Sequence, residues 1–200
     1  MAYGRLTSAI PLGQGLFSTL FRSLSPSSAS LCSPLSSSAI RFSSFRSSDL
    51  HTVRRPQLLP KPAKCPDFGM MHTDYMLEVE YAEGGWGKPL IRPYEEIQLD
   101  PMAKVLHYAT SVFEGLKAFR GSDDKIRVFR IDENMKRMVK SAKRATLPEF
   151  CPVELEELIC ELVRMESEWV PSEPGSSLYI RPLLFGTDPS IGINVSASAR

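Results

Sequence analysis

The 200-residue sequence lacks the features that mark membrane-spanning, disulfide-rich and nucleic-acid-binding chains. No stretch contains the ~18 uninterrupted apolar residues that a membrane-spanning helix needs. The 4 cysteines include no C-x-x-C pair, so neither a zinc ribbon nor a dense disulfide framework is indicated. Basic residues number 24 and acidic residues 23, and this balance argues against a dedicated nucleic-acid binder. The apolar fraction of 42% still suffices for a packed core.

Acidic side chains are missing from residues 1–48, which contain 4 arginines and 15 serines. Such a composition is typical of a mitochondrial transit peptide, because a cationic amphipathic helix is drawn toward a negative-inside membrane. Apolar residues recur at nearly helical spacing between Leu12 and Arg22. Residues 1–48 are therefore predicted to be a disordered segment that directs import into the mitochondrial matrix.

The N-terminus also allows other interpretations. Plastid import is the next alternative. Secretion ranks below it, because Pro11, Gly13 and Gly15 interrupt the apolar run that a secretory signal would need. A serine-rich tail without a targeting role fits the composition too. The complete absence of acids over 1–48 favours mitochondrial import.

Residues 49–67 are predicted to be an extended linker or arm rather than a helix. Each proline fixes φ and removes a hydrogen-bond donor, and the segment contains Pro56, Pro60, Pro62 and Pro66. Cleavage of the leader is expected before or within this arm.

Residues 68–175 are predicted to form a domain that opens with antiparallel strands. Residues 72–82 alternate with a period of two, which indicates a half-buried strand, and residues 87–95 are expected to return beside it. Residues 116–120 and 126–131 are short apolar runs around a turn, which predicts a second hairpin.

Two helices should follow these strands. Asp132 is a favourable N-cap for the first, and Pro152 suits the first turn of the second. The apolar face of the first helix consists of Met135, Met138, Val139, Ala142 and Ala145. Apolar residues of the second helix recur at a 3-4-3-4 spacing at Leu155, Leu158, Leu162, Met165 and Trp169. Its glutamates are expected on the outside, at Glu154, Glu156, Glu157 and Glu161.

A strongly apolar strand is predicted over residues 177–185, within a last segment, 176–200, that ends in turns. The resulting order of four strands, two helices and a strand indicates an α+β fold.

A short motif and a helical arginine could carry chemistry. Phe113, Glu114 and Gly115 lie where a helix should give way to a strand, and glycine permits the sharp change of backbone direction. Arg137 lies near a helix N-terminus, where a basic side chain can bind a phosphate. The alternatives are a plain helix end before a buried strand, and a solvated charge on a basic helix face.

Tyr179 and Arg181 form a third candidate. They lie two residues apart on a predicted strand and therefore share a face. A phenol and a guanidinium together can bind one carboxylate or phosphate. The alternative is a stacked pair on a partly exposed strand.

In their order and spacing these segments resemble the branched-chain aminotransferases, which are fold-type-IV enzymes that use pyridoxal phosphate. The resemblance extends from about Phe68 to Ile193. It includes TDYMLEVEY, GWGKPLIRPY, LHYATSVFEGLKAF, VFRIDENMKRM and GSSLYIRPLLFGTDPSIGI. It is greatest to animal mitochondrial forms, and the transit-like leader agrees with it independently.

The resemblance implies residue roles. Arg137 matches the arginine that binds the cofactor phosphate. Phe68 matches an aromatic that covers the aliphatic side chain of the substrate, and Tyr179 and Arg181 match the pair that lines the pocket beside it. The implied reaction transfers the amino group of leucine, isoleucine or valine to 2-oxoglutarate, with pyridoxal 5′-phosphate as the cofactor.

The resemblance also implies a homodimer. Tyr108 matches a pocket tyrosine that reaches the neighbouring subunit's site, and Ile193 matches an apolar residue on the interdomain loop that is lent to the partner. The expected fold is the small N-terminal domain, an antiparallel sheet with two helices, followed by the first strand of an incomplete large domain.

One departure from the family pattern is serious. The Schiff-base lysine of the family lies in a G-x-x-N-Y-K-like segment, and none of the nine lysines here has that context. Lys117, in GLKAF, occupies a strand position without that role in the family. The 200 residues are therefore expected to be an N-terminal fragment that lacks a catalytic residue and is inactive alone.

Two alternatives stay open at this point. The chain could belong to another fold-type-IV transaminase, although the long LHYATSVFEGLKAF match argues against that. It could also be a non-catalytic dimerisation module that contacts a full-length subunit through Tyr108 and Ile193.

Overall fold

The computed structural model describes residues 2–5, 21–23, 44–82 and 84–200. A five-stranded antiparallel sheet lies at its centre, in the order β1-β11-β9-β10-β2. The bounds of these strands are β1 Ala2–Arg5, β11 Ser176–Ile180, β9 Leu116–Arg120, β10 Ile126–Phe129 and β2 Phe21–Ser23. The predicted hairpin of residues 116–131 is thus confirmed as β9 and β10. Most of residues 1–48, which are predicted to be disordered, lie outside the described residues, and the described residues 2–5 and 21–23 form β1 and β2.

In the described part of the chain, three smaller sheets accompany the central one. In the first, β7 pairs with β3 in parallel and with β4 in antiparallel orientation, whereas β5–β6 and β8–β12 are antiparallel pairs. The bounds are β3 His51–Thr52, β4 Tyr75–Glu78, β5 Tyr81–Ala82, β6 Gly85–Trp86, β7 Leu90–Pro93, β8 Ser111–Phe113 and β12 Leu183–Phe185. The strand predicted over residues 72–82 is therefore divided into β4 and β5.

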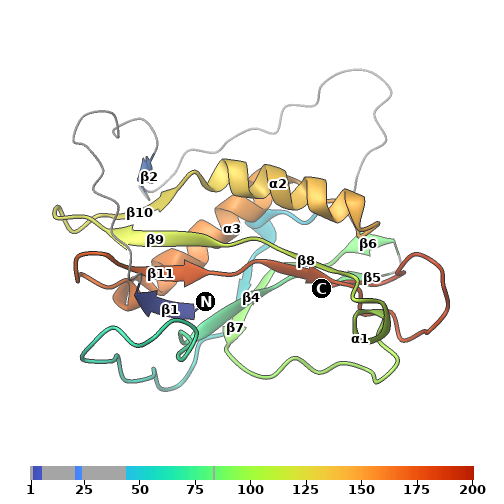
Figure 1. Ribbon diagram of the computed structural model, residues 1–200, viewed down its shortest axis with the longest axis horizontal. Coiled ribbons are helices and arrows are strands. Elements are labelled where there is room, and N and C mark those ends of the chain that lie inside the picture. Colours follow the sequence, from blue (N-terminus) through green and yellow to red (C-terminus); the bar gives the residue numbers. More distant parts are fainter. Residues whose placement is uncertain (1, 6–20, 24–43, 83) are drawn as a thin grey trace.

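Two long helices cover one face of the central sheet (Figure 1). They are α2, Ile131–Arg144, and α3, Pro152–Met165. The short elements are α1 Lys104–Tyr108, η1 Ser47–Asp49 and η2 Ser167–Trp169. This combination confirms the predicted α+β class. Among the described residues, no helix is long and apolar enough to cross a membrane.

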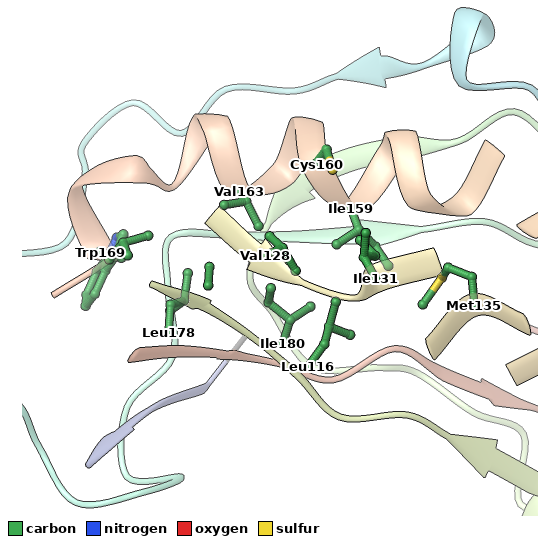
Figure 2. Packing of buried hydrophobic residues seen from close by; sticks show 12 residues of the cluster. Leu116, Val128, Ile131, Met135, Ile159, Cys160, Val163, Trp169, Leu178 and Ile180 are labelled. Carbon is green, nitrogen blue, oxygen red and sulfur yellow. The ribbon is translucent and has the colours of Figure 1, made fainter. Parts of the chain in front are cut away.

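The core forms where α2 and α3 meet β9, β10 and β11 (Figure 2). Leu116, Val128 and Leu178 point from the strands toward Met135 of α2 and Val163 of α3. Side chains that alternate along the strands put one set under the helices and leave the other set on the opposite face. That opposite face carries Tyr179 and Lys117, which are cross-strand partners.

The long apolar strand predicted over residues 177–185 is split in two. β11 ends at Ile180 and β12 begins at Leu183. Pro182 has no backbone N–H, so the ladder of hydrogen bonds cannot continue through it. Its carbonyl instead accepts the Glu114 N–H at 3.1 Å.

Helix α2 begins two residues earlier than the predicted N-cap implies. Its N-cap is Arg130, in the left-handed region with φ 47°, and not Asp132. Asp132 lies instead in the first turn with Glu133. Carboxylates there interact favourably with the positive end of the helix dipole, which accounts for the acidic signal in the sequence.

The glutamates of α3 are not all on the outside. Glu156 is buried, with 6% of its surface exposed. Glu154 and Glu157 accept hydrogen bonds from the backbone N–H and the hydroxyl of Ser47, each at 2.6 Å. The segment around η1 therefore lies against the helix face that the sequence pattern assigns to solvent.

The arm predicted over residues 49–67 begins with the end of η1 and with β3, and its remainder, residues 53–67, contains no helix or strand. Asp74 fastens this remainder. The buried Asp74 carboxylate accepts hydrogen bonds from the Leu59 N–H at 2.6 Å and from Lys61 Nζ at 2.8 Å. Trp169 Nε1 donates to it at 2.7 Å. Burial raises the pKa of Asp74, but these bonds outweigh it and hold the pKa below its usual value.

Replacing Glu166 with glutamine should stabilise the protein near neutral pH. Burial is the main reason that the pKa of Glu166 is raised, and the charge of Asp74 adds to it. A group whose pKa is raised in the folded state contributes fully to folding stability below its unfolded-state pKa. This stabilisation is lost as the pH rises through the folded-state pKa, so Glu166 no longer provides it once it ionises. Glutamine cannot ionise, yet its oxygen can still accept the Tyr75 N–H that Glu166 accepts at 2.5 Å.

Urea unfolding should show a gain in the free energy of unfolding on the order of 1 kcal/mol for Glu166→Gln at neutral pH, shrinking in acid. Glu161→Gln on the same helix is the control, because Glu161 is exposed and pairs with Arg164. A Glu166→Gln variant that loses stability at neutral pH would show that the ionised carboxylate is favourable there.

Candidate functional site

The candidate site lies where two neighbouring strands are interrupted at the same level. Leu116 pairs with Ile180 on one side of the interruption, and Phe113 pairs with Leu183 on the other. Between these pairs, the segment 114–115 faces the segment 181–182. At this break Gly115 faces Tyr179 on the sheet face opposite the helices, whereas the Glu114 carboxylate reaches Asn134 and Arg137 of α2.

Phe68, Tyr179 and Arg181 are brought together at this point. The rings of Phe68 and Tyr179 meet edge to face, with centroids 4.9 Å apart. Arg181 Nε donates to the Tyr179 hydroxyl at 3.0 Å, and the guanidinium carbon lies 4.3 Å from the centroid of the Phe113 ring. The three side chains offer an apolar surface next to a fixed cation, which suits an apolar ligand with a carboxylate.

Gly115 makes room for Tyr179. A β-carbon at Gly115 would overlap the Tyr179 hydroxyl oxygen and would lie 3.0 Å from the ring carbon that bears it. The glycine of the Phe-Glu-Gly motif is thus explained by the close approach of a side chain, and not by the turn that the sequence suggests.

Arg137 is bonded to Glu114, whose chain neighbours Phe113 and Gly115 lie against Arg181 and Tyr179. Arg137 Nε and Nη2 donate to the Glu114 carboxylate at 2.9 and 2.8 Å, and Asn134 Nδ2 donates to the same carboxylate at 2.9 Å. Burial raises the pKa of Glu114, but the bonds from Arg137 and Asn134 outweigh it and lower the pKa overall. The same ion pair raises the pKa of Arg137. Both groups therefore stay charged at neutral pH.

Tyr108 and Ile193 belong to a second group. Both line a cavity of about 260 Å³ between α1 and the loop of residues 186–196. The Tyr108 hydroxyl donates to the Ile191 carbonyl. The side chain of Ile193 is 98% exposed.

Lys104 and Glu114 each bind several partners that the sequence did not predict. Lys104 is 1% exposed, and its ammonium donates to the Asn194 carbonyl at 2.6 Å and to the Asn194 side chain at 2.8 Å. It also pairs with Asp188 at 3.2 Å. These partners lie far away in the chain, so no local pattern around Lys104 could reveal them.

Comparison with known proteins tests the resemblance to branched-chain aminotransferases. No protein-family model matches the chain. The cytosolic branched-chain-amino-acid aminotransferase of Rattus norvegicus is 48% identical over 157 residues, which are 78% of this chain and 38% of that protein. The mitochondrial enzyme of Bos taurus is 45% identical over 154 residues, which are 76% of this chain and 39% of that protein.

The chain is similar to branched-chain-amino-acid aminotransferases. The resemblance to branched-chain aminotransferases is thereby confirmed. A greater likeness to the mitochondrial forms is not, because relatives of both the cytosolic and the mitochondrial type match. The chain spans about two fifths of the length of these relatives. The structure of a branched-chain amino acid aminotransferase from Escherichia coli matches 62% of this chain and 39% of its own, at 29% identity and a TM-score of 0.45.

Substituting alanine for Gly115 should displace Tyr179 from the candidate site. The new methyl group would push the ring away from Arg181 and Phe68, and such overpacking typically costs about 1–3 kcal/mol. Chemical denaturation of Gly115→Ala measures this cost. Gly115→Ala combined with Tyr179→Phe should recover part of it, because the overlapping hydroxyl is gone.

Gly85→Ala is the matched control for this prediction. A β-carbon at Gly85 meets no atom within 4 Å, so its stability should change by about 0.5 kcal/mol or less. Equal stability of Gly115→Ala and wild type would mean that Tyr179 moves aside without loss.

Proposed function

We propose that the chain supplies part of the active site of a branched-chain-amino-acid aminotransferase, which transfers the amino group of leucine, isoleucine or valine to 2-oxoglutarate. The observation that carries the proposal is the contact of Phe68 with Tyr179 beside Arg181. Arg137 is bonded to Glu114, which follows Phe113 in the chain and precedes Gly115. The similarity to aminotransferases over 157 residues supports it.

The side chains present fit pyridoxal 5′-phosphate at its phosphate end. Arg137 is 57% exposed, and its pairing with Glu114 uses Nε and Nη2, so the end of the guanidinium can still receive an anion. When bound, the cofactor supplies an aldehyde for the amino group and a ring that withdraws electrons. The residues of this chain hold the phosphate and orient the substrate.

Phe68 and Tyr179 select the substrate. Phe68 and Tyr179 form a surface that excludes water from an aliphatic side chain, and Arg181 can bind the carboxylate. Lys117 is the cross-strand partner of Tyr179 and shares its face of the sheet. It is not assigned a catalytic role, because it lacks the sequence context of the family lysine.

Titration of the purified chain with pyridoxal 5′-phosphate and with pyridoxal tests the proposal. We expect the phosphorylated form to bind more tightly, and we expect no turnover of leucine with 2-oxoglutarate by these 200 residues alone. Equal binding of the two forms would contradict the phosphate site. Borohydride trapping with the aldehyde bound on Lys117, together with turnover, would contradict the expected inactivity.

We further propose that Tyr108 and Ile193 contact a second copy of the chain in a homodimer. A fully exposed apolar side chain beside a cavity lined by Tyr108 supports this assignment. Sedimentation of wild type and Ile193→Asp tests it. A wild-type monomer at concentrations up to about 100 μM, a range in which weak dimers form, would contradict it.

Import into the mitochondrial matrix is proposed from the acid-free residues 1–48. Fusion of residues 1–60 to a fluorescent reporter in animal cells tests it. A matched fusion with Arg5, Arg22, Arg41 and Arg46 replaced by glutamine should stay diffuse. Diffuse or secretory fluorescence of the unaltered fusion would contradict import.

A further inference from the structure

The carboxylate of Glu114 is held from several directions at once. Its Oε1 lies 2.9 Å from Arg137 Nε, and its Oε2 lies 2.8 Å from Arg137 Nη2 and 2.9 Å from Asn134 Nδ2. The Glu114 backbone N–H donates to the Pro182 carbonyl at 3.1 Å. The acid is thus fixed both through its main chain and through its side chain.

Exposure differs sharply between the two partners of the ion pair. The Glu114 side chain is 13% exposed, whereas that of Arg137 is 57% exposed. A long arginine side chain on an exposed helix face loses conformational entropy when it is held in one geometry. Because Glu114 is the more rigid partner, it determines the position of Arg137 and not the reverse.

The way in which Glu114 holds the guanidinium leaves a defined edge for another ligand. The pair occupies Nε and one N–H of Nη2, which form one edge of the planar group. The end formed by Nη1 and Nη2 still offers two parallel N–H donors. That spacing matches two oxygens of a phosphate.

We propose that Glu114 is a positioning residue that holds Arg137 by its Nε–Nη2 edge and so presents the Nη1–Nη2 end to the phosphate of pyridoxal 5′-phosphate. The binding of the phosphate by Arg137 rests on the proposed function. The positioning of Arg137 by Glu114 rests only on the hydrogen bonds between them.

Two possible roles of Glu114, neutralising Arg137 or positioning it, predict opposite effects of Glu114→Gln on ligand affinity. If Glu114 only neutralised Arg137, its removal would expose a full positive charge, and every phosphate-bearing ligand would bind more tightly. If Glu114 positions Arg137, a ligand that needs two aligned hydrogen bonds should bind more weakly. The lowered pKa of Glu114, which reflects its bonds to Arg137 and Asn134 despite burial, keeps the carboxylate charged at neutral pH.

Glu133→Gln is the matched control. Glu133 lies on the same helix, pairs with Lys136 at 2.7 Å and contributes its charge to the field at Arg137. Its replacement removes the same charge near Arg137 without removing a hydrogen bond to it. A difference between Glu114→Gln and Glu133→Gln therefore reports position rather than net charge.

The experiment uses the full 200-residue chain, labelled with ¹⁵N, in the wild type and these variants. The Nε–H signal of Arg137, assigned by its disappearance in Arg137→Lys, should be visible in the wild type and in Glu133→Gln and should be lost to solvent exchange in Glu114→Gln. Binding of pyridoxal 5′-phosphate should weaken about two- to tenfold in Glu114→Gln and stay unchanged in Glu133→Gln. Inorganic phosphate is not attached to a ring and can follow a displaced guanidinium, so its binding should not weaken in either variant.

Persistence of the Arg137 signal in Glu114→Gln would overturn the inference, as would tighter binding of pyridoxal 5′-phosphate by that variant.

If Glu114→Gln does not fold, Asn134→Ala replaces it, because it removes one hydrogen bond to the Glu114 carboxylate and keeps both charges. A weaker Arg137 signal is then expected, and an unchanged signal overturns the inference. If Glu114→Gln loses the signal but Arg137→Ala binds the cofactor as the wild type does, the hold on Arg137 is supported and the proposed phosphate site is contradicted.

Discussion

Replacing Arg137 with alanine should weaken the binding of pyridoxal 5′-phosphate about ten- to a hundredfold. A charge-assisted hydrogen bond contributes roughly 1.5–3 kcal/mol, and a guanidinium can make two such bonds to one phosphate. Lysine cannot reproduce this geometry, so Arg137→Lys should recover only part of the affinity. Fluorescence or absorbance titration of each variant gives the dissociation constants.

This substitution also leaves Glu114 without its main partner. A half-buried carboxylate that loses its partner costs about 1–3 kcal/mol of stability. The double variant Arg137→Ala with Glu114→Gln removes this cost and should bind the cofactor as weakly as Arg137→Ala alone. Arg144→Ala, an exposed change in the last turn of the same helix, is the control for charge. Equal dissociation constants for Arg137→Ala and wild type would remove Arg137 from the site.

Local patterns in the sequence predict the elements whose causes are local. The bounds of β9 at Leu116 and Arg120 and the start of α3 at Pro152 agree with the expected positions. Strand periodicity and a proline in the first helical turn act within a few residues of the chain. Met135 and Met138 are likewise buried, as the helical spacing predicts.

The observed structure differs from the predicted one where contacts between segments distant in the sequence determine the conformation. The break at Pro182 becomes visible only when β8 and β12 are known to pair, and the burial of Glu156 depends on the whole environment of α3. The grouping of Phe68 with Tyr179 could not be read from spacing, because more than a hundred residues separate them. The resemblance to aminotransferases named these residues, and the fold supplies their contacts.

The ion pair of Glu114 with Arg137 shows the same limit at the site itself. Both residues are visible in the sequence as candidates, but the helix argument directs Arg137 toward the backbone amides at the start of α2. In the structure Arg137 lies in the second turn of α2 and bonds to the link between β8 and β9. Its proposed role in phosphate binding thus depends on a strand connection rather than on the helix terminus.

Replacing Trp169 with alanine should cause the largest loss of stability, about 3–5 kcal/mol. Trp169 is 2% exposed and lies at one end of the main core cluster (Figure 2). Its Nε1 donates to Asp74 at 2.7 Å, and Lys61 Nζ lies 4.6 Å from its ring centroid. The substitution therefore creates a cavity and also loosens the carboxylate that fastens the arm leading to Phe68.

Two further variants separate these causes. Trp169→Phe retains most of the apolar volume but removes the donor to Asp74, so its loss should be smaller, about 1–3 kcal/mol. Glu168 lies on the same 3₁₀ helix, is 75% exposed and makes a long ion pair with Lys61 of the arm at 3.9 Å. Such an exposed pair contributes little, so Glu168→Ala should change the free energy of unfolding by no more than about 0.5 kcal/mol. Because trypsin can cleave after Lys64 once the arm detaches, cleavage there should become faster in both Trp169 variants than in Glu168→Ala. Equal cleavage rates in all three proteins would mean that the bond from Trp169 to Asp74 does not hold the arm, and that Phe68 is kept against Tyr179 by other contacts.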